Sequence, residues 1–259
     1  MKYNKMKRCS GGIRSMTIDR VAVKLRAKET IRYAKPSMIT AGLLYTLLSV
    51  FISYLSLRLT GIDTEAMSKA LQMTQNGYPE RALDFLMNQM PGTGASFIDV
   101  LLRIALSIVA AGFSLFVMNT VRGTAPSYGN LLDGFGLLPR LLVLLLLEYV
   151  FVILWSLLFV IPGIIAGYRY SMAIYILLDH PEMSAMDCIR ESKRITTGYK
   201  GQLFILDLSF ILWAIASAVP VIGYAVQVYL TPYMETAKFL YYEQLRAPEV
   251  YYAESGSPF

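Results

Sequence analysis

Residues 141–161 read LLVLLLLEYVFVILWSLLFVI, and this stretch decides the fold. Glu148 is its only charged residue. A helix of this length is about 30 Å long at a rise of about 1.5 Å per residue, which matches the hydrocarbon core of a bilayer. Pro162 and Gly163 follow directly, and proline breaks a helix because it lacks the N–H group and clashes with the preceding turn. The stretch therefore predicts a transmembrane helix that ends in a hairpin turn.

Five further segments share this apolar character. They are residues 38–57, 97–118, 164–178, 203–219 and 222–242. Pro220 ends the fifth of the resulting six helices, and Pro232 interrupts the sixth. The chain of 259 residues is 55% hydrophobic and only 16% charged, against about 25% in an ordinary soluble domain. We therefore expect an all-α, polytopic helical membrane protein with six transmembrane helices in a membrane domain at 37–245. The composition excludes a disordered chain, a disulfide scaffold and most soluble enzymes.

The positive charge is concentrated in a tail at residues 1–36. This tail holds eleven Lys or Arg residues against two acidic ones, a net charge of +9, although the whole chain carries only +6. A basic tail before a first apolar helix favours a cytoplasmic N-terminus by the positive-inside rule. The loops at 119–140 and 179–202 carry further Lys and Arg residues, so six crossings place them and the C-terminal tail at 246–259 on the cytoplasmic side. We therefore expect a multi-pass protein of the cell (plasma) membrane that binds no nucleic acid.

Two helices are expected to lie along the cytoplasmic surface of the bilayer. Residues 18–33 and 184–197 both place apolar side chains at helical spacing among basic ones, and Ser184 is the expected N-cap of the second helix. A linker helix in solvent is the alternative for residues 18–33. The candidate contacts for anionic lipid headgroups are the basic side chains of these helices: Arg20, Lys24, Lys28, Arg190, Lys193 and Arg194.

The outer loop at 58–96 is too long for a bare connection. It is expected to form two short helices, at 64–75 and 79–90, separated by Asn76 and Gly77. The first residue of the second helix is Pro79, which suits the first turn of a helix because the missing N–H has no helical partner there. We expect the stripe of apolar residues on this second helix to pack on its own helices; the alternatives are the bilayer surface, the mouth of a pocket or a partner.

The sequence supplies little chemistry. Its one histidine, His180, follows the end of a predicted span and is expected to cap a loop, and no nucleotide-binding or metalloprotease motif is present. Cys9 and Cys188 both fall on the predicted cytoplasmic side, where thiols stay reduced. We therefore expect no catalytic residues, no metal and no cofactor.

Glu148 and Arg169 are charged residues inside predicted spans. Such residues are rare in membrane helices and usually face the protein interior or a watery cavity. The two lie on the two arms of the predicted hairpin, at depths that differ by only a few Å. The spacing predicts an intramembrane ion pair, which either staples the hairpin or forms part of a path for a substrate or ion.

Small residues recur every fourth position on the fourth predicted span. Gly163, Gly167 and Ser171 form this small-residue stripe. Small side chains at this spacing let a second helix approach closely. The stripe is a candidate helix-packing surface within the protein, or else a contact in a homo-oligomer or with a membrane-protein partner.

Residues 119–245 resemble an uncharacterised family of bacterial membrane proteins, "domain of unknown function 975". The matching words are Val121-Arg122-Gly123, Ile161-Pro162-Gly163-Ile164-Ile165-Ala166, Arg169-Tyr170-Ser171-Met172-Ala173, Asp179, Pro181, Ser192-Lys193, Gly198-Tyr199-Lys200 and Pro232-Tyr233. This family is similar in pattern to the membrane region of some glycerophosphodiester phosphodiesterases. Because the sequence contains no catalytic domain of that kind, the resemblance implies a fold and a location without an activity.

These observations lead to one functional hypothesis and one alternative. We expect a non-enzymatic integral membrane protein that binds lipid, above all anionic headgroups at the cytoplasmic face, or partner proteins, and that helps to organise the envelope. The alternative is a small transporter or channel-like carrier that uses Glu148 and Arg169.

Overall fold

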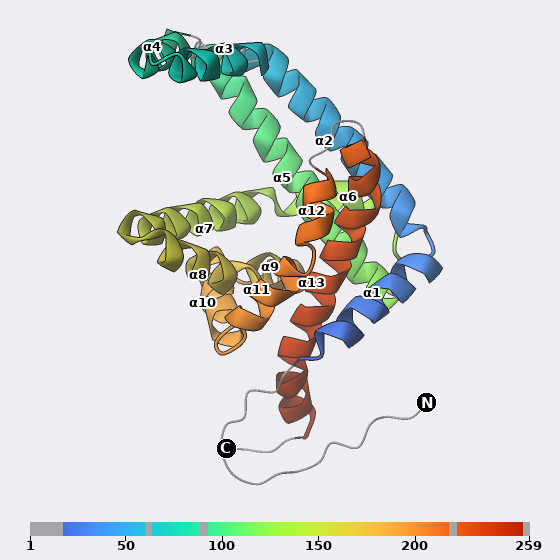
Figure 1. Cartoon of the computed structure of the whole chain (residues 1–259). Coiled ribbons are helices and arrows are strands. Elements are labelled where there is room, and N and C mark those ends of the chain that lie inside the picture. The colour runs from blue at the N-terminus through green and yellow to red at the C-terminus, as the bar shows by residue number, and fades with distance from the viewer. Residues whose placement is uncertain (1–17, 61–63, 89–92, 218–221, 256–259) are drawn as a thin grey trace.

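The computed structural model describes residues 18–60, 64–88, 93–217 and 222–255, and their regular structure is helical throughout (Figure 1). The long helices are α2 (Met38–Thr60), α5 (Thr93–Arg122), α7 (Leu138–Leu158) and α13 (Ile222–Ser255). The shorter ones are α1 (Arg20–Tyr33), α3 (Thr64–Gln75), α4 (Pro79–Asn88), α6 (Asn130–Asp133), the 3-10 helix η1 (Gly134–Leu137), α8 (Val160–Tyr170), α9 (Ala173–Asp179), α10 (Ala185–Ile195), α11 (Lys200–Leu208) and α12 (Ile211–Ser217).

Helices α2 and α5 pack against each other and carry α3 and α4 at one end of the molecule (Figure 1). The two helices expected in the outer loop are therefore present, and the last two residues of the predicted range 79–90 lie outside the described residues. At the opposite end lie α1, α10 and the last turns of α13. The chain thus has an α3–α4 end and an α1–α10 end, separated by the long helices.

Helices α7 and α8 form the hairpin that the sequence predicts, but the break is not at Pro162. It lies at Phe159, whose backbone is extended with φ −163° and ψ 152°. Pro162 sits in the first turn of α8, where its missing N–H has no helical partner to lose. Proline therefore begins the second arm of the hairpin and does not interrupt it.

The predicted fourth and fifth spans are each divided into two helices. The fourth runs from α8 into α9 through a turn at Ser171 and Met172. The fifth consists of α11 and α12, which are bent by 41° relative to each other. The hydropathy pattern predicts the apolar stretches but not the turns inside them. A turn that neighbouring helices support needs no proline or glycine, so it leaves no mark in the sequence.

Helix α13 passes through Pro232 without the predicted interruption. Pro232 has no N–H group, so the carbonyl of Val228, four positions earlier, lacks its helical hydrogen-bond donor. This carbonyl faces Gly42 of α2 so closely that a Cβ atom on Gly42 would lie 2.6 Å from its oxygen. Gly42 therefore lets α2 approach α13 closely at the point where α13 lacks a hydrogen bond.

Four helical segments are long and apolar enough to cross a membrane, and the bent pair α11–α12 brings the number to five among the described residues. The four are Met38–Leu59, Phe97–Arg122, Asn130–Leu158 and Val160–Asp179. The predicted sixth span, residues 222–242, lies in α13 and is not among them. Polar groups such as Glu235 and Lys238 are tolerated there, since α13 packs against α1, α2, α5 and α12.

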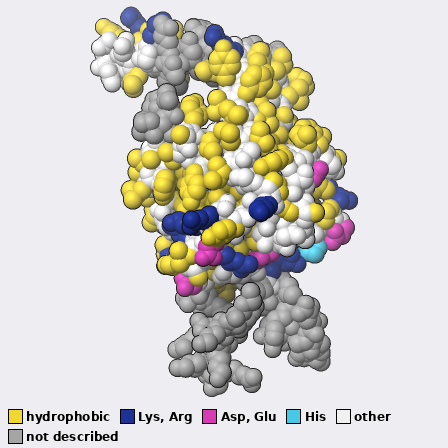
Figure 2. Space-filling model, turned by 90° about the vertical axis from the view of Figure 1, so that its right-hand side faces the viewer, with side chains coloured by type: hydrophobic (Ala, Val, Ile, Leu, Met, Phe, Trp, Pro, Cys, Tyr) yellow, Lys and Arg dark blue, Asp and Glu magenta, His cyan; other side chains and the backbone are white. Residues whose placement is uncertain are grey.

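The packed core lies toward the α1–α10 end, whereas much of the remaining surface is apolar and exposed. Phe116, Tyr241 and Tyr242 are fully buried, while Leu157 and Phe159 at the α7–α8 tip are 78% and 71% exposed. Figure 2 shows hydrophobic side chains over most of one face, with a band of Lys, Arg, Asp and Glu toward its lower part and further Lys or Arg side chains at the top. An exposed apolar surface of this extent is unfavourable in water, and the hydrocarbon core of a bilayer would cover it along the long helices.

Candidate functional site

Glu148 and Arg169 do not form the predicted ion pair. The guanidinium carbon of Arg169 lies 5.9 Å from the centre of the Trp155 ring, and its Nε atom is buried without a hydrogen-bond partner in the described part of the chain. Glu148 is half-buried on α7 and forms no ion pair with the residues that the structure describes. Equal depth along a hairpin does not fix the face of the helix, and Arg169 turns toward Trp155.

The small-residue stripe packs against a helix only at its first position. A Cβ atom on Gly163 would lie 2.0 Å from the Oγ of Ser156 on α7, so this glycine lets the hairpin arms approach. A Cβ atom on Gly167 would meet nothing within 4 Å. Gly167 and Ser171 instead line an open groove of about 480 Å³ between α7, α8 and α11, which we call the α7–α8 groove. The groove is lined chiefly by apolar and small residues.

Helix α1 has two different faces. Val23, Ala27 and Ile31 are buried in the core, and Val21 and Leu25 are exposed beside basic residues. Asp19 is the N-cap, since its carboxylate accepts from two backbone N–H groups of the first turn. The helix is therefore docked on α13 and keeps a mixed apolar and basic outer face, which suits the boundary of a bilayer.

The candidate headgroup cations of α1 differ in their surroundings. Lys24 donates to the Oγ of Ser209 at 3.0 Å and lies over the ring of Phe210. Lys28 is exposed, with its Nζ 5.7 Å from the centre of the Tyr233 ring, and Arg20 is partly exposed. Lys24 thus also serves the packing of α1 on its neighbours, and Lys28 is the more accessible cation.

Helix α10 has the predicted N-cap, because the Ser184 hydroxyl accepts from the N–H of Asp187. Its apolar side, however, does not face lipid. Cys188 and Ile189 are buried against the protein, and α10 packs on α7, α8 and α9. The stripe on this helix therefore docks it beneath the hairpin.

The three basic residues of α10 point outward, but two of them are paired. Arg190 contacts Asp187 at 3.1 Å, and Arg194 contacts Glu191 through two hydrogen bonds. The hydrogen bond from Arg194 lowers the pKa of Glu191. Lys193 is exposed and forms no ion pair with the residues that the structure describes. Among the three basic residues of α10, Lys193 is therefore the one whose charge is not offset by an acidic neighbour among the described residues.

Two buried hydroxyl groups of α10 hold the turn between α8 and α9. The Ser192 Oγ accepts from the N–H of Met172 at 3.2 Å and donates to the carbonyl of Arg169 at 2.9 Å. The Thr196 hydroxyl lies 3.2 Å from the same carbonyl. Backbone groups at helix ends lack helical partners, and α10 supplies them from its side chains. These residues were not predicted as site residues.

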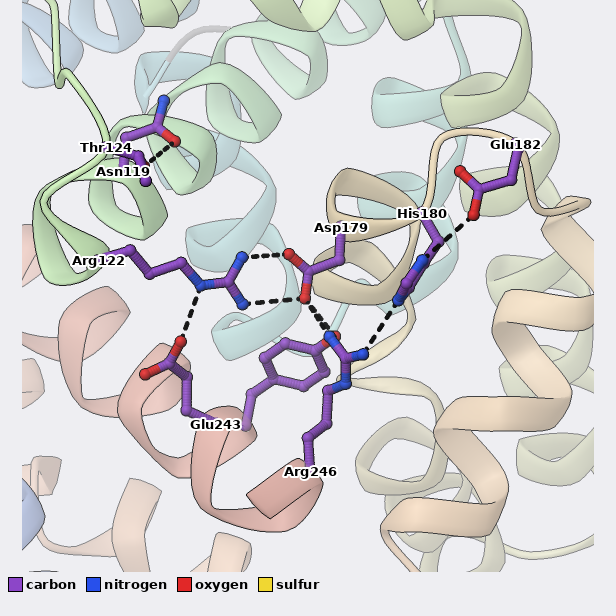
Figure 3. Close-up of polar contacts among 9 residues, drawn as sticks. Asn119, Arg122, Thr124, Asp179, His180, Glu182, Glu243 and Arg246 are labelled. Carbon is purple, nitrogen blue, oxygen red and sulfur yellow. Dashed lines mark hydrogen bonds and ion pairs between the residues drawn. The ribbon is translucent and has the colours of Figure 1, made fainter. Parts of the chain in front are cut away.

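A second cluster that the sequence did not predict joins α5, α9 and α13 (Figure 3). Asp179, at the end of α9, accepts from Arg122 and from Arg246, which lies 2.5 Å away. The Tyr242 hydroxyl donates to the same carboxylate at 2.9 Å, and Arg122 also contacts Glu243. We call these residues the Asp179 cluster. One carboxylate thus ties the ends of α5 and α9 to α13.

His180 next to this cluster caps α9 as expected, since its N–H donates to the carbonyl of Ile176. Its ring Nδ1 lies 3.2 Å from Glu182, and its Nε2 lies 3.0 Å from a guanidinium nitrogen of Arg246 (Figure 3). Because guanidinium only donates, Nε2 accepts and Nδ1 carries the proton. Across the described residues, no group of three or more His, Cys, Asp or Glu side chains could hold a metal ion.

The fold and the α1–α10 end define the class of protein. It is an all-helical, multi-pass membrane protein with a charged end built on α1, α10 and α13. Residues 157–249 match the model of the family described as "Protein of unknown function (DUF975)", which confirms the family resemblance over that segment. The matched segment contains α8 to α12, the Asp179 carboxylate and Arg246. No curated protein and no solved structure matches the chain.

Proposed function

We propose that the protein is a non-enzymatic scaffold of the cell membrane whose α1–α10 end faces the cytoplasm and binds anionic lipid headgroups or partner proteins. The observation that carries the proposal is the outer face of α1, where Lys28 is exposed beside Val21 and Leu25. Each basic group near an anionic surface contributes about 1 kcal/mol of attraction. Lys193 on α10 adds an unpaired charge at the same end of the molecule.

The proposal includes six crossings of the membrane by the chain. Helix α13 runs from the level of α12 to the α1–α10 end (Figure 1), and its neighbours shield its polar residues. If α13 crosses with the bent pair α11–α12, both α1 and the end of α13 lie on the cytoplasmic side. The carrier alternative has less support, because Glu148 and Arg169 do not meet across the hairpin.

The headgroup proposal is tested by neutralising α1. The double variant Arg20→Gln, Lys28→Gln and the wild type are reconstituted in phosphatidylcholine bilayers, and the association of spin-labelled phosphatidylglycerol is compared with that of spin-labelled phosphatidylcholine. We expect a lower preference for phosphatidylglycerol, by at most about fivefold for each charge removed.

The control is Arg81→Gln on α4, an exposed cation at the opposite end of the molecule. It should leave the preference in the leaflet of the α1–α10 end unchanged. An unaltered preference in the double variant, or an equal loss in Arg81→Gln, would contradict the proposal.

A further inference from the structure

The α7–α8 groove has the dimensions of a ligand site. Its volume of about 480 Å³ falls within the range of about 300–1,000 Å³ that is common for small-molecule pockets. Gly163 and Gly167 of α8 and Ser171, which caps its C-terminus, follow one another over about 12 Å, at about 1.5 Å per residue. Val152, Ile164 and other apolar residues complete the lining. The groove is thus an apolar trough inside segments suited to span a membrane.

Three cations lie near one end of this groove, although none of them is part of its lining. Arg169 follows Tyr168, which lines the groove, and its Nε atom is buried without a hydrogen-bond partner among the described residues. Lys193 follows Ser192, whose hydroxyl donates to the carbonyl of Arg169, and Lys200 precedes by one turn Phe204, whose ring contacts that of Tyr168. Three cations therefore gather where α8, α10 and α11 meet, and the described residues provide none of them with an ion-pair partner.

The one acidic residue in the lining does not cancel this charge. The Oδ1 of Asp207 on α11 lies 3.4 Å from the ammonium group of Lys238 on α13, which offsets its charge, although this oxygen accepts no hydrogen bond from the described residues. Asp207 is seven residues after Lys200, which places both on nearly the same face of α11, two turns apart. From Lys200 to Asp207 the groove therefore changes from a cationic end to a neutral one.

We propose that the α7–α8 groove binds one anionic phospholipid from the leaflet at which α10 lies. One acyl chain extends along Gly163, Gly167 and Ser171, and the phosphate lies beside Arg169, Lys193 and Lys200. A phospholipid carries both parts of this pattern, an apolar chain and a negative charge at one end of it. The inference deepens the proposed function, on which it rests, by assigning one defined lipid site apart from the α1 surface.

The experiment fills the groove and counts bound lipid. Wild-type protein and variants are purified in detergent, incubated with equal amounts of phosphatidylglycerol and phosphatidylcholine of identical acyl chains, and weighed intact by native mass spectrometry. Gly167→Leu places a side chain in open space within the groove. We expect the wild type to retain one phosphatidylglycerol and Gly167→Leu to lose it.

Two further variants make the result specific. Gly201→Leu makes the same change on the exposed side of α11, where a Cβ atom also meets nothing within 4 Å, and it should retain the lipid. The double variant Lys193→Gln, Lys200→Gln leaves the groove open and should lower the preference for phosphatidylglycerol over phosphatidylcholine about fivefold per charge. If Gly167→Leu fails to fold, Ile164→Trp fills the same groove from a half-exposed position.

The proposal is overturned if the groove-filled variant retains phosphatidylglycerol as the wild type does, or if the wild type retains both lipids equally. These outcomes are separate from a failure of the headgroup proposal, which would show only in the α1 variants. Loss of lipid in both Gly167→Leu and Gly201→Leu would also contradict a site in this groove.

Discussion

At the scale of single residues, Ser192 joins two helices that would otherwise end with open backbone groups. It is fully buried, and its hydroxyl serves one donor and one acceptor on either side of the turn between α8 and α9. The sequence marks Ser192 only through the family resemblance. Its partners lie 20 and 23 positions earlier in the chain, and no local pattern connects them.

Replacing this hydroxyl should destabilise the protein. In Ser192→Ala the N–H of Met172 loses its partner in a buried position, and such a loss costs about 1–3 kcal/mol. Thr197→Ala, which removes an exposed hydroxyl five residues further along the chain, should change the free energy of unfolding by less than about 0.5 kcal/mol. Unfolding by sodium dodecyl sulfate in mixed micelles measures both, and equal stabilities would contradict the role given to Ser192.

Cys188 tests whether α10 is docked on the protein or lies against lipid and water. The side chain is fully buried, and burial raises the pKa of its thiol to about 11. The reactive thiolate is therefore scarce at pH 8 in the folded protein, and it becomes abundant only as the pH rises through the folded pKa. In a Cys9→Ser background, maleimide should label Cys188 slowly until detergent unfolds the chain. Rapid labelling of folded protein at pH 8 would mean that α10 is not docked.

At the scale of elements, apolar runs and caps are predicted well and long-range contacts are not. The bounds of α3, the N-cap Ser184 and the hairpin of α7 and α8 follow from local signals. The break at Phe159 was not predicted. The sequence pattern points to Pro162 as the helix breaker, but proline fits the first turn of α8 without breaking it. The docking of α10 also escapes, since an amphipathic helix looks the same whether its apolar side meets lipid or protein.

The Asp179 cluster is the contact between elements that most needs testing. Asp179→Asn keeps the side chain's shape but leaves Arg122 and Arg246 without their shared carboxylate. Hydrogen bonds to charged groups contribute about 1.5–3 kcal/mol, and we expect a loss of this size in the free energy of unfolding. Arg190→Gln breaks an exposed ion pair with Asp187 and should cost less than about 1 kcal/mol. Similar effects of the two variants would show that the cluster is not a tie between helices.

At the scale of the whole molecule, charge and apolar surface separate along the long helices. The α3–α4 end and the α1–α10 end are joined by helices suited to cross a bilayer, and α1 and α10 with their basic residues lie at one of these ends (Figure 1). The sequence predicts this separation because positive charge controls orientation. It does not predict that α13 is a central helix, since burial among other helices hides polar residues that lower its hydropathy.

Orientation is tested most directly by labelling single cysteines from each side of the membrane. In a Cys9→Ser background, Tyr78→Cys marks the exposed turn between α3 and α4, and Thr197→Cys marks the exposed segment after α10. A membrane-impermeant maleimide is applied to spheroplasts and to inside-out vesicles. We predict that Tyr78→Cys is labelled only in spheroplasts and Thr197→Cys only in inside-out vesicles. Labelling of both positions from the same side, or of Thr197→Cys from outside, would contradict the account.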